Sequence, residues 1–420
     1  MHAFRSSRRI GGGVALAGVA AASVLIGAAV ASAASSHAVH PVPRTVYVSP
    51  TGRSHARDVS CKTASFSTIG GAVASAPVGS KVIVCPGVYH EDVSVFKRLT
   101  LEGRHAVIDA SGKINGIHLT ASGSQVHGFT VMNAQGEGIL VGSVVPPVST
   151  PGKVIAIRNV TIANNVVEHN DLGALAATPT YPECQAQGQI PGDCGEGIHL
   201  DGAIGVHVTN NVLTGNSGGV LLTDEAGPTA SNVISNNLVI GNLYDCGITL
   251  AAHNPNVVVL GKTHAAVGGV YHNTVSGNHA VGNGIKGEGA GVLIAVAGPG
   301  TANFGNTVVG NVLSDNELSG VTVHAHSPGV NIGGNRILNN WIFTNNTGAG
   351  DFPNGPSAGH DTATTGILVY SAAQPVSITI AHNQIFANAI GVWRTTNVSA
   401  SGIASNAFIS VGTNVVTSAP

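Results

Sequence analysis

The sequence has few charged and few aromatic residues. Asp, Glu, Lys and Arg make up 9% of its 420 residues, and Phe, Trp and Tyr make up 4%. The formal net charge is −2, and no basic stripe or acidic tail stands out along the whole chain. This balance argues against nucleic acid as a partner. Because aromatic rings are scarce, the core must be built from Val, Ile and Leu.

Only one long apolar run is present, and it lies at the N-terminal end. It extends from Val14 to Val30, follows Arg5, Arg8 and Arg9, and ends at the cleavage pattern Ala31-Ser32-Ala33. This pattern predicts a secretion signal over residues 1–33, followed by a linker over 34–44. Whether export uses the general or the twin-arginine route stays open. We expect a secreted, extracellular protein, with wall attachment or a periplasmic location as alternatives, and with no membrane partner after cleavage.

Five cysteines in an exported chain indicate disulfides. The local pairings are Cys61 with Cys85, on either side of a short helical segment, and Cys184 with Cys194, across a loop. Cys246 is then left as a buried thiol. The main alternative joins Cys246 to Cys194 and leaves Cys184 reduced.

The motif Asn-x-x-x-x-Asn, with an aliphatic residue inside, recurs seven times between residues 160 and 390. The copies are NVVEHN (165–170), NVLTGN (211–216), NLVIGN (237–242), NTVSGN (273–278), NVLSDN (311–316), NWIFTN (340–345) and NQIFAN (383–388). One coil length with variable insertions explains their irregular spacing. Such repeats predict stacked units that bury a shared core between neighbours.

Within a copy, strand-like triplets alternate with turns. Period two places Val160 and Ile162 on the inner face and Thr161 on the outer face. Three short strands joined by tight turns would form one coil. We expect Asn at the corners because it tolerates a left-handed backbone, and because stacked Asn residues can pass amide hydrogen bonds from coil to coil. The repeated Asn residues therefore have a structural role.

These copies and the segment FSTIGGAVASAPVGSKVIVCPGVYHEDV (66–93) resemble the right-handed parallel β-helix superfamily, in its pectin-lyase-like form with NosD/CASH-type repeats. The resemblance covers about residues 45–415 and implies a short helix that caps the first coil. We expect an all-β, monomeric, single-domain solenoid of about ten coils. Residues 45–110 would form the N-terminal cap and first coils and residues 111–415 the repeats, with SNAFIS (405–410) as a decayed eighth copy.

Most coils also contain a Gly-led strand, such as Gly197-Ile-His-Leu-Asp201, and a variant begins at Ala389. The second and fourth residues are aliphatic and should point inward, so the third and fifth point outward. The outward row contains His118, His199, Asp201, Thr223, Thr249, Thr322, His324, Tyr370 and Trp393. Long insertions leave after this strand, so row and loops would line one groove. We expect Thr223, Thr249, His324, Tyr370 and Trp393 to bind an extracellular polysaccharide there.

The densest group of polar residues in this row comes from three adjacent coils. It consists of His199, Asp201, Asp224, Glu225 and His253. As a catalytic centre, the carboxylates would act as acid and base, with His199 or His253 as proton carrier. As a cation site, the three carboxylates would hold Ca²⁺ as a cofactor. A third hypothesis is structural, with carboxylates that cap turns.

His324 and His326 form a second candidate site. Period two puts both imidazoles on the same side of a strand end, which suits a copper or zinc pair, although no third ligand is evident. The superfamily's enzyme motifs are missing: the chain has no Asp-Asp pair or Gly-His-Gly of polygalacturonase-like hydrolases, and no Asp-Pro-His-Asp of mannuronan epimerases. The resemblance therefore implies a fold without an activity.

Three functions remain from the sequence. The leading hypothesis is a secreted β-helix that binds a polysaccharide and, if it is an enzyme, acts as a lyase, hydrolase or epimerase. The first alternative is a surface or adhesion module without catalysis. The second is a NosD-like periplasmic accessory that handles a metal through His324 and His326.

Overall fold

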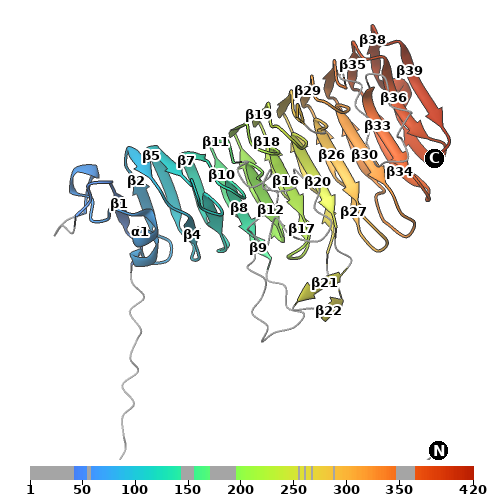
Figure 1. Ribbon diagram of the computed structural model, residues 1–420. Helices are drawn as coiled ribbons and strands as arrows, with labels where there is room; N and C mark the ends of the chain where they lie inside the picture. Colours follow the sequence, from blue (N-terminus) through green and yellow to red (C-terminus); the bar gives the residue numbers. More distant parts are fainter. Residues whose placement is uncertain are drawn as a thin grey trace, which may run out of the picture. The chain divides into compact units, whose positions relative to one another are not determined.

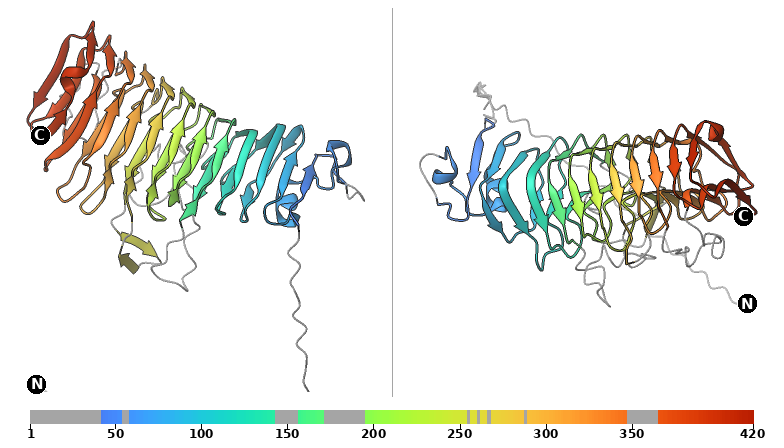
Figure 2. Two further views of the ribbon diagram at one scale, coloured as in Figure 1. Left: turned by 180° about the vertical axis from the view of Figure 1, so that it is seen from behind. Right: turned by 90° about the horizontal axis from the view of Figure 1, so that it is seen from above.

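The structure is a computed structural model, and it describes residues 42–53, 58–142, 156–170, 195–253, 256–259, 262–265, 268–286, 289–346 and 365–420. The described residues form a right-handed parallel β-helix within one compact unit that spans residues 41–420, as the sequence predicts (Figures 1 and 2). Its described strands pair in parallel, apart from the antiparallel hairpin of β21 (Asn256–Val259) and β22 (Lys262–Ala265).

Each complete coil contributes one strand to each of three parallel columns. The first column consists of β10 (Thr161–Ala163), β14 (His207–Thr209), β18 (Val233–Ser235), β24 (Thr274–Ser276), β28 (Thr307–Val309), β31 (Asn335–Leu338), β34 (Val376–Ala381) and β37 (Val398–Ser401). The second consists of β11 (Val166–Glu168), β15 (Val212–Thr214), β19 (Leu238–Ile240), β25 (His279–Val281), β29 (Val312–Ser314), β32 (Trp341–Phe343), β35 (Gln384–Phe386) and β38 (Ala407–Ile409).

The third column is an 11-stranded sheet within the described residues, and it carries the candidate site. Its strands are β4 (Val93–Val95), β6 (Ile117–Leu119), β8 (Ile139–Gly142), β12 (Ile198–Asp201), β16 (Val220–Thr223), β20 (Ile248–Ala252), β26 (Val292–Val296), β30 (Val321–Ala325), β33 (Thr365–Ser371), β36 (Ile390–Thr395) and β39 (Thr413–Ser418).

Shorter and longer strands complete the stack. A minor column follows the third one: β9 (Ile157–Arg158), β13 (Ala203–Ile204), β17 (Thr229–Ala230), β23 (Val270–Tyr271) and β27 (Asn303–Phe304). In the first coils β5 (Thr100–Asp109) and β7 (Gln125–Met132) run through both of the first two columns, next to β1 (Thr45–Val48), β2 (Lys81–Val84) and β3 (Gly87–Tyr89).

Alternation along each strand builds one aliphatic core inside the coils. Val160 and Ile162 are fully buried and Thr161 between them is only partly so, as period two predicts. In the third column Ile198 and Leu200 point into the same core, while His199 does not belong to it. The few aromatic residues contribute little, and Val, Ile and Leu supply most of the packing.

Glycine leads most strands of the third column because neighbouring coils approach closely there. These residues are Gly116, Gly138, Gly197, Gly219, Gly247, Gly291, Gly320, Gly366 and Gly391. A Cβ added to any of them would lie 2.2–3.0 Å from a carbonyl oxygen of the next coil. Gly391, and not Ala389, therefore heads the last variant, which corrects the expected alignment of that strand.

The repeated Asn residues form buried amide ladders from coil to coil, as predicted. One ladder contains Asn165, Asn211, Asn237, Asn278, Asn311, Asn340, Asn383 and Asn406. A second contains Asn170, Asn216, Asn242, Asn283, Asn316, Asn345 and Asn388. Asn406 lies in SNAFIS, so that segment does continue the stack.

The structure shifts the fourth copy of the repeat by one corner. Asn237 pairs with Asn278 and not with Asn273, so the copy in that coil is NHAVGN (278–283). Asn273 belongs to a shorter third ladder with Asn232, Asn306 and Asn335. The pattern Asn-x-x-x-x-Asn occurs at both corners of that coil, and the sequence alone could not tell them apart.

The left-handed backbone at the corners lies one residue before the position we expected. Asn164, Asn210 and Asn236 have φ of 56°, 56° and 55°, and each directly precedes a ladder Asn. The ladder residues themselves have negative φ. The two roles that we gave to one Asn are therefore divided between neighbours: the first turns the chain and the second bonds along the stack.

The N-terminal end is capped by α1 (Ile69–Ser75), as the resemblance implied. Thr68 caps its first turn, and the Glu91 carboxylate accepts the Ile69 and Gly70 N–H groups at 2.7 and 2.9 Å. Two 3₁₀ turns, η1 (Cys61–Thr63) and η3 (Ile403–Ser405), lie near the two ends. Within the described ranges no helix is long and apolar enough to cross a membrane.

The cysteine predictions have different outcomes. Cys61 and Cys85 form the expected disulfide. Cys246 is a buried free thiol, and burial raises its pKa above the usual range, with the Asp245 carboxylate adding to the effect. Cys184 and Cys194 lie outside the described residues.

Candidate functional site

The candidate site occupies the outer face of the third column, where side chains point away from the main core. Several residues that we expected to line an open groove are instead buried there. Thr223 is 1% exposed, Thr249 5%, Tyr370 3% and Trp393 4%, and none of them belongs to the main core. The outward direction was predicted correctly, but these side chains do not offer a free surface for stacking on a sugar.

Tyr370 and Trp393 pack into a small apolar cluster of their own with Leu368. Their rings are stacked with centroids 6.4 Å apart and an interplanar angle of 3°. Because Gly391 lies opposite Gly366 of the preceding coil, Trp393 lies in register with Leu368 and not with Tyr370. The two rings therefore stack on each other inside this buried cluster.

A chain of polar contacts begins at Glu137, which directly precedes the glycine at the head of β8. Its Oε1 lies 3.2 Å from His199 Nδ1, and its Oε2 accepts the Glu196 N–H at 2.9 Å. His199 Nε2 lies 2.9 Å from Thr223 Oγ1. Burial alone would lower the pKa of His199, but the hydrogen bond and charge of Glu137 raise it above the ordinary value.

The same chain continues through Thr223 to Glu225 and His253. The Glu225 Oε1 lies 2.5 Å from His253 Nδ1, and both side chains are about one-third exposed, at 33% and 34%. Burial acts to raise the pKa of Glu225, but hydrogen bonds from His253 and Thr223, with the charge of His253, lower it to about 2. Contacts thus run from Glu137 to His253 across adjacent coils.

Asp201 lies beside this chain, and its acidity differs from that of Glu225. Its Oδ1 accepts the Ala226 N–H at 2.7 Å. Burial, together with the negative charge of Glu225, raises the pKa of Asp201 to about 7. Two neighbouring carboxyl groups with pKa values pushed apart are the arrangement that separates an acid from a base.

Asp224, one of the three candidate carboxylates, accepts hydrogen bonds from backbone N–H groups. It is fully buried, and its two oxygens accept the backbone N–H groups of His253 at 2.8 Å and Gly269 at 2.7 Å. The carboxylate therefore holds together the loop ends that follow β20. Among the described residues no group of three or more His, Cys, Asp or Glu is arranged to hold a metal ion.

His324 and His326 lie at the end of β30 with Ala325 buried between them. Both rings are on the same side, as period two predicts, and His324 Nδ1 contacts His326 Nε2. Burial, with a smaller effect of His326, lowers the pKa of His324 to about 3, and burial lowers the pKa of His326 as well. The Tyr370 ring lies 6.1 Å from His326.

The remaining row residues make local contacts. Thr249 Oγ1 donates to Asp245 Oδ2 at 3.4 Å, and Thr322 Oγ1 lies 2.5 Å from Ser319 Oγ. His118 lies on β6, in register with Leu140. These residues contribute to packing on the outer face.

Glu137 is the member of the polar chain that sequence reasoning missed. The triplet Gly-Glu-Gly, which contains Glu137, occurs at 136–138, 195–197 and 287–289. Each of these Glu residues directly precedes a glycine, and at Gly138 and Gly197 neighbouring coils approach closely, so a carboxylate there is expected to be buried. A buried carboxylate needs hydrogen-bond or charged partners. That signal was available, but its partner His199 is 62 residues away and cannot be paired with it from sequence.

Comparison with known proteins identifies one family. The model of the family described as periplasmic copper-binding protein (NosD) matches residues 104–258, 149–298 and 244–420. No curated protein matches the chain.

Several solved structures are similar to it in part. An alginate lyase from Paenibacillus sp. str. FPU-7 is 15% identical over 90% of this chain and 99% of that one, with a TM-score of 0.46. A mannuronan C-5 epimerase A-module from Azotobacter vinelandii is 15% identical over 81% and 91%, with a TM-score of 0.43. A pectate lyase is 15% identical over 90% and 79%, with a TM-score of 0.34. At these scores no functional argument rests on the similarity.

Proposed function

This chain belongs to the family of periplasmic copper-binding proteins (NosD), and from that premise we propose that it binds copper outside the cytoplasm through His324 and His326. The observation that carries the proposal is the direct contact of two imidazole nitrogens, His324 Nδ1 and His326 Nε2. The Cys61–Cys85 disulfide supports the location, because such bonds persist in oxidising compartments.

The chemistry of the pair suits copper. Imidazole nitrogen is a good copper ligand, and among divalent first-row metals copper binds such sites most strongly. Only the neutral ring can bind, and the lowered pKa of His324, about 3, keeps that ring neutral at any pH near neutrality. Among the described residues no third His, Cys, Asp or Glu joins this pair, so the proposed site supplies two imidazole nitrogens to the ion. The two rings must open slightly to admit an ion.

The test is a competition titration of the full chain with Cu(I) and Cu(II) against a chromophoric chelator. We expect one equivalent of copper to bind tightly in the wild type, and to be lost in His324→Gln/His326→Gln. The matched control is His207→Gln/His279→Gln, which removes two exposed imidazoles elsewhere. Equal copper binding by both double variants would refute the proposal.

A second function is favoured by the separated pKa values of Asp201 and Glu225. We propose that these carboxyl groups can act as acid and base on an extracellular glycan that reaches the exposed edge at Glu225 and His253. His199 and Thr223 would position Glu225 through the hydrogen-bond chain. Acid and base catalysis together require one protonated and one ionised carboxyl group at the same pH. The raised pKa of Asp201 and the lowered pKa of Glu225 supply that pair near pH 6.

This second function is tested by incubating the chain with polyuronates and neutral glycans, and by recording new reducing ends and the absorbance of unsaturated products. Asp201→Asn and Glu225→Gln should each abolish turnover, while Glu168→Gln, on the second column, should not. Turnover that survives both site substitutions would exclude this role for the pair. No turnover on any substrate would leave copper binding as the function of the chain.

A further inference from the structure

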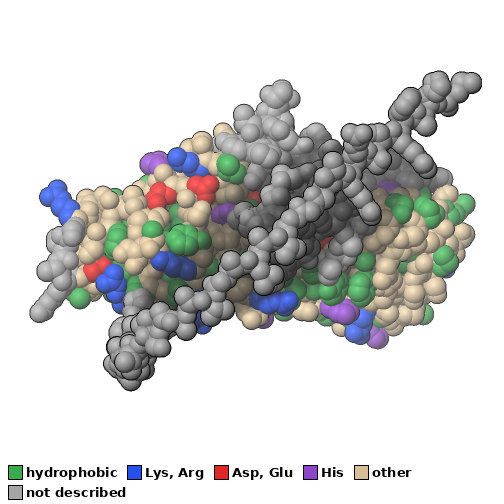
Figure 3. Space-filling view, turned by 90° about the horizontal axis from the view of Figure 1, so that it is seen from below, with side chains coloured by type: hydrophobic (Ala, Val, Ile, Leu, Met, Phe, Trp, Pro, Cys, Tyr) green, Lys and Arg blue, Asp and Glu red, His purple; other side chains and the backbone are tan. Residues whose placement is uncertain are grey.

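A basic and apolar surface at the N-terminal end has no role in the functions proposed above. The net charge of −2 conceals an uneven distribution: residues 42–113 contain nine Lys and Arg against five Asp and Glu, and residues 114–420 contain six against fifteen. Lys and Arg side chains are more frequent toward the end formed by the first coils, on the left of Figure 3. The first coils are therefore positive, while the rest of the chain is negative.

Exposed apolar side chains gather in the same region. Five of the ten exposed large hydrophobic residues of the described chain lie between residues 42 and 96, although this stretch is a small part of it. Val42 is 77% exposed, Val78 53% and Phe96 57%. Single exposed apolar residues need no explanation, but such a concentration beside positive charge does.

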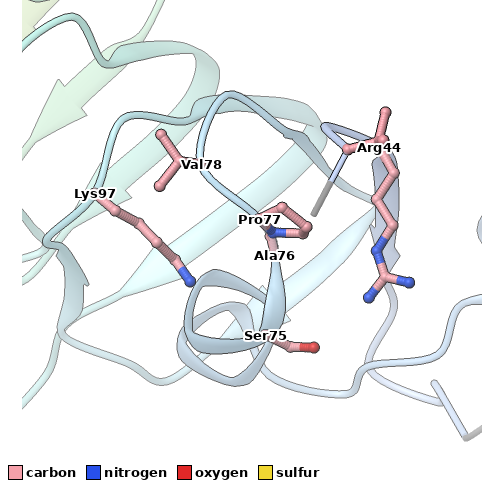
Figure 4. A pocket seen from close by; sticks show the side chains of 7 residues that line it. Arg44, Ser75, Ala76, Pro77, Val78 and Lys97 are labelled. Carbon is pink, nitrogen blue, oxygen red and sulfur yellow. The ribbon is translucent and has the colours of Figure 1, made fainter. Parts of the chain in front are cut away.

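A pocket brings these two kinds of side chain together. It has a volume of about 620 Å³ and is lined by Val42, Arg44, Ser75, Ala76, Pro77, Val78 and Lys97. Arg44 and Lys97 lie on opposite sides of Pro77, and the apolar floor lies between them (Figure 4). Three segments contribute the lining residues: the residues before β1, the end of α1 with the residues after it, and the segment between β4 and β5.

The cations around the pocket are available to a partner. Lys97 Nζ uses one N–H to donate to the Ala74 carbonyl at 2.8 Å and lies 5.4 Å from the centre of the Phe96 ring. A Cβ added at Gly79 would lie 3.3 Å from Pro43 Cγ and 3.7 Å from an Arg98 guanidinium nitrogen, so both side chains lie beside that glycine. Within the described chain, the ion pairs do not include Arg44, Lys97 or Arg98. The three charges are therefore not neutralised locally.

We propose that this N-terminal surface, defined by Val42, Arg44, Val78, Phe96, Lys97 and Arg98, docks on an anionic lipid membrane. Basic side chains attract acidic headgroups, and the exposed side chains of one aromatic and two aliphatic residues would insert between them. A soluble polyanion would engage the cations only and would leave the exposed apolar side chains without a partner. The combination therefore favours a lipid surface, contrary to the sequence-based expectation of no membrane partner.

The experiment is co-sedimentation of the full chain with vesicles of phosphatidylcholine alone, or of phosphatidylcholine and phosphatidylglycerol in equal amounts. Arg44→Gln/Lys97→Gln/Arg98→Gln is compared with Lys113→Gln/Arg158→Gln/Arg336→Gln, which removes three exposed cations elsewhere. Because both variants keep residues 1–41 and lose the same charge, their difference isolates the surface. Melting temperatures confirm that both remain folded.

We expect about five-fold weaker binding to acidic vesicles for each cation removed, so roughly 100-fold for the site variant, and a few-fold for the control. Val78→Ser/Phe96→Ser should weaken binding roughly tenfold. Equal binding by the two triple variants would overturn the proposal. It would also fail if the apolar variant bound vesicles normally while dextran sulfate displaced the wild type, because the surface would then recognise polyanions.

Discussion

The amide ladders and the outer face of the third column both bury polar side chains, but they satisfy them differently. In the ladders each Asn meets an identical Asn one coil away, as when Asn237 donates its backbone and side-chain N–H groups to Asn278 Oδ1 at 2.9 and 3.0 Å. On the outer face the contacts join unlike residues, such as Glu137 with His199 and Glu225 with His253.

This difference separates structural from functional polar residues. A contact that repeats in every coil stabilises the stack wherever it occurs, so its chemistry carries no information about a ligand. A contact that occurs in one coil only is not required for the stacking of the coils. The contacts that run from Glu137 to His253, and the paired imidazoles, lie on the outer face and do not recur from coil to coil, which is why we propose a function there.

The largest expected effect comes from breaking the close approach of the coils. A Cβ at Gly219 would lie 2.2 Å from the Gly247 carbonyl oxygen and 2.3 Å from Val239 Cγ1. Gly219→Ala should therefore destabilise the chain by about 4 kcal/mol or more in denaturant unfolding. The control Gly241→Ala has φ of +64° and open space around its Cβ, so it should cost about 1 kcal/mol. Equal costs would contradict the close approach.

The ladder itself is tested by Asn278→Ala. This change leaves two Asn237 donors without their acceptor and the Ile234 carbonyl without its donor. We expect a loss of about 3 kcal/mol in the free energy of unfolding. Asn236→Ala is the matched control: it is exposed with φ of 55° and should cost about 1 kcal/mol. A loss no larger than the control's would mean that the ladder contributes nothing beyond the turn.

The paired imidazoles should make stability depend on pH. An unfolded His titrates near pH 6.5, whereas the pKa of His324 in the folded chain is about 3, so below pH 6.5 the unfolded chain binds the extra proton. The free energy of unfolding should therefore fall as the pH falls, by about 2 kcal/mol at pH 5 relative to pH 7. His324→Gln should remove this part of the decrease. An unchanged pH profile would show that His324 titrates normally.

Asp201 should give a smaller effect of opposite sign. Its folded pKa of about 7 lies above the value of about 3.9 for an unfolded Asp, so the folded chain holds the proton and loses stability as the pH rises through 7. Asp201→Asn keeps an oxygen for the Ala226 N–H and should stabilise the chain by about 1–2 kcal/mol at pH 8, after allowance for solvent screening. At pH 4 the wild type and Asp201→Asn should have the same free energy of unfolding. A destabilised variant at pH 8 would mean that the Asp201 carboxylate is ionised and favourably paired.

Much of the fold could be predicted from the sequence because it repeats. The aliphatic alternation around Val160 and Ile162, the Asn stack and the capping helix all follow from local patterns, and the structure has each of them. The error at Asn273 arose where one motif fits two neighbouring corners, and the error at Ala389 arose because a shift of two residues along a strand keeps its alternation. Only the pairing between coils distinguishes these alternatives.

The site was predictable only in part, for a physical reason. The sequence placed His199, Glu225 and His253 together because neighbouring coils bring them into line. It could not show that both Asp224 oxygens accept backbone N–H groups, or that Tyr370 is buried. The partners of Asp224 and the exposure of Tyr370 depend on the course of the loops, which the repeat pattern does not predict. The direction of a side chain follows from the period of two along the strand, whereas its exposure depends on which other residues pack over that side chain.

The most direct test of the copper proposal is electron paramagnetic resonance of the chain loaded with one equivalent of Cu(II). The contact between His324 and His326 predicts hyperfine structure from two imidazole nitrogens in the wild type, and its loss in His324→Gln/His326→Gln. The same two-nitrogen spectrum from the double variant would contradict it, because copper would then bind at other residues.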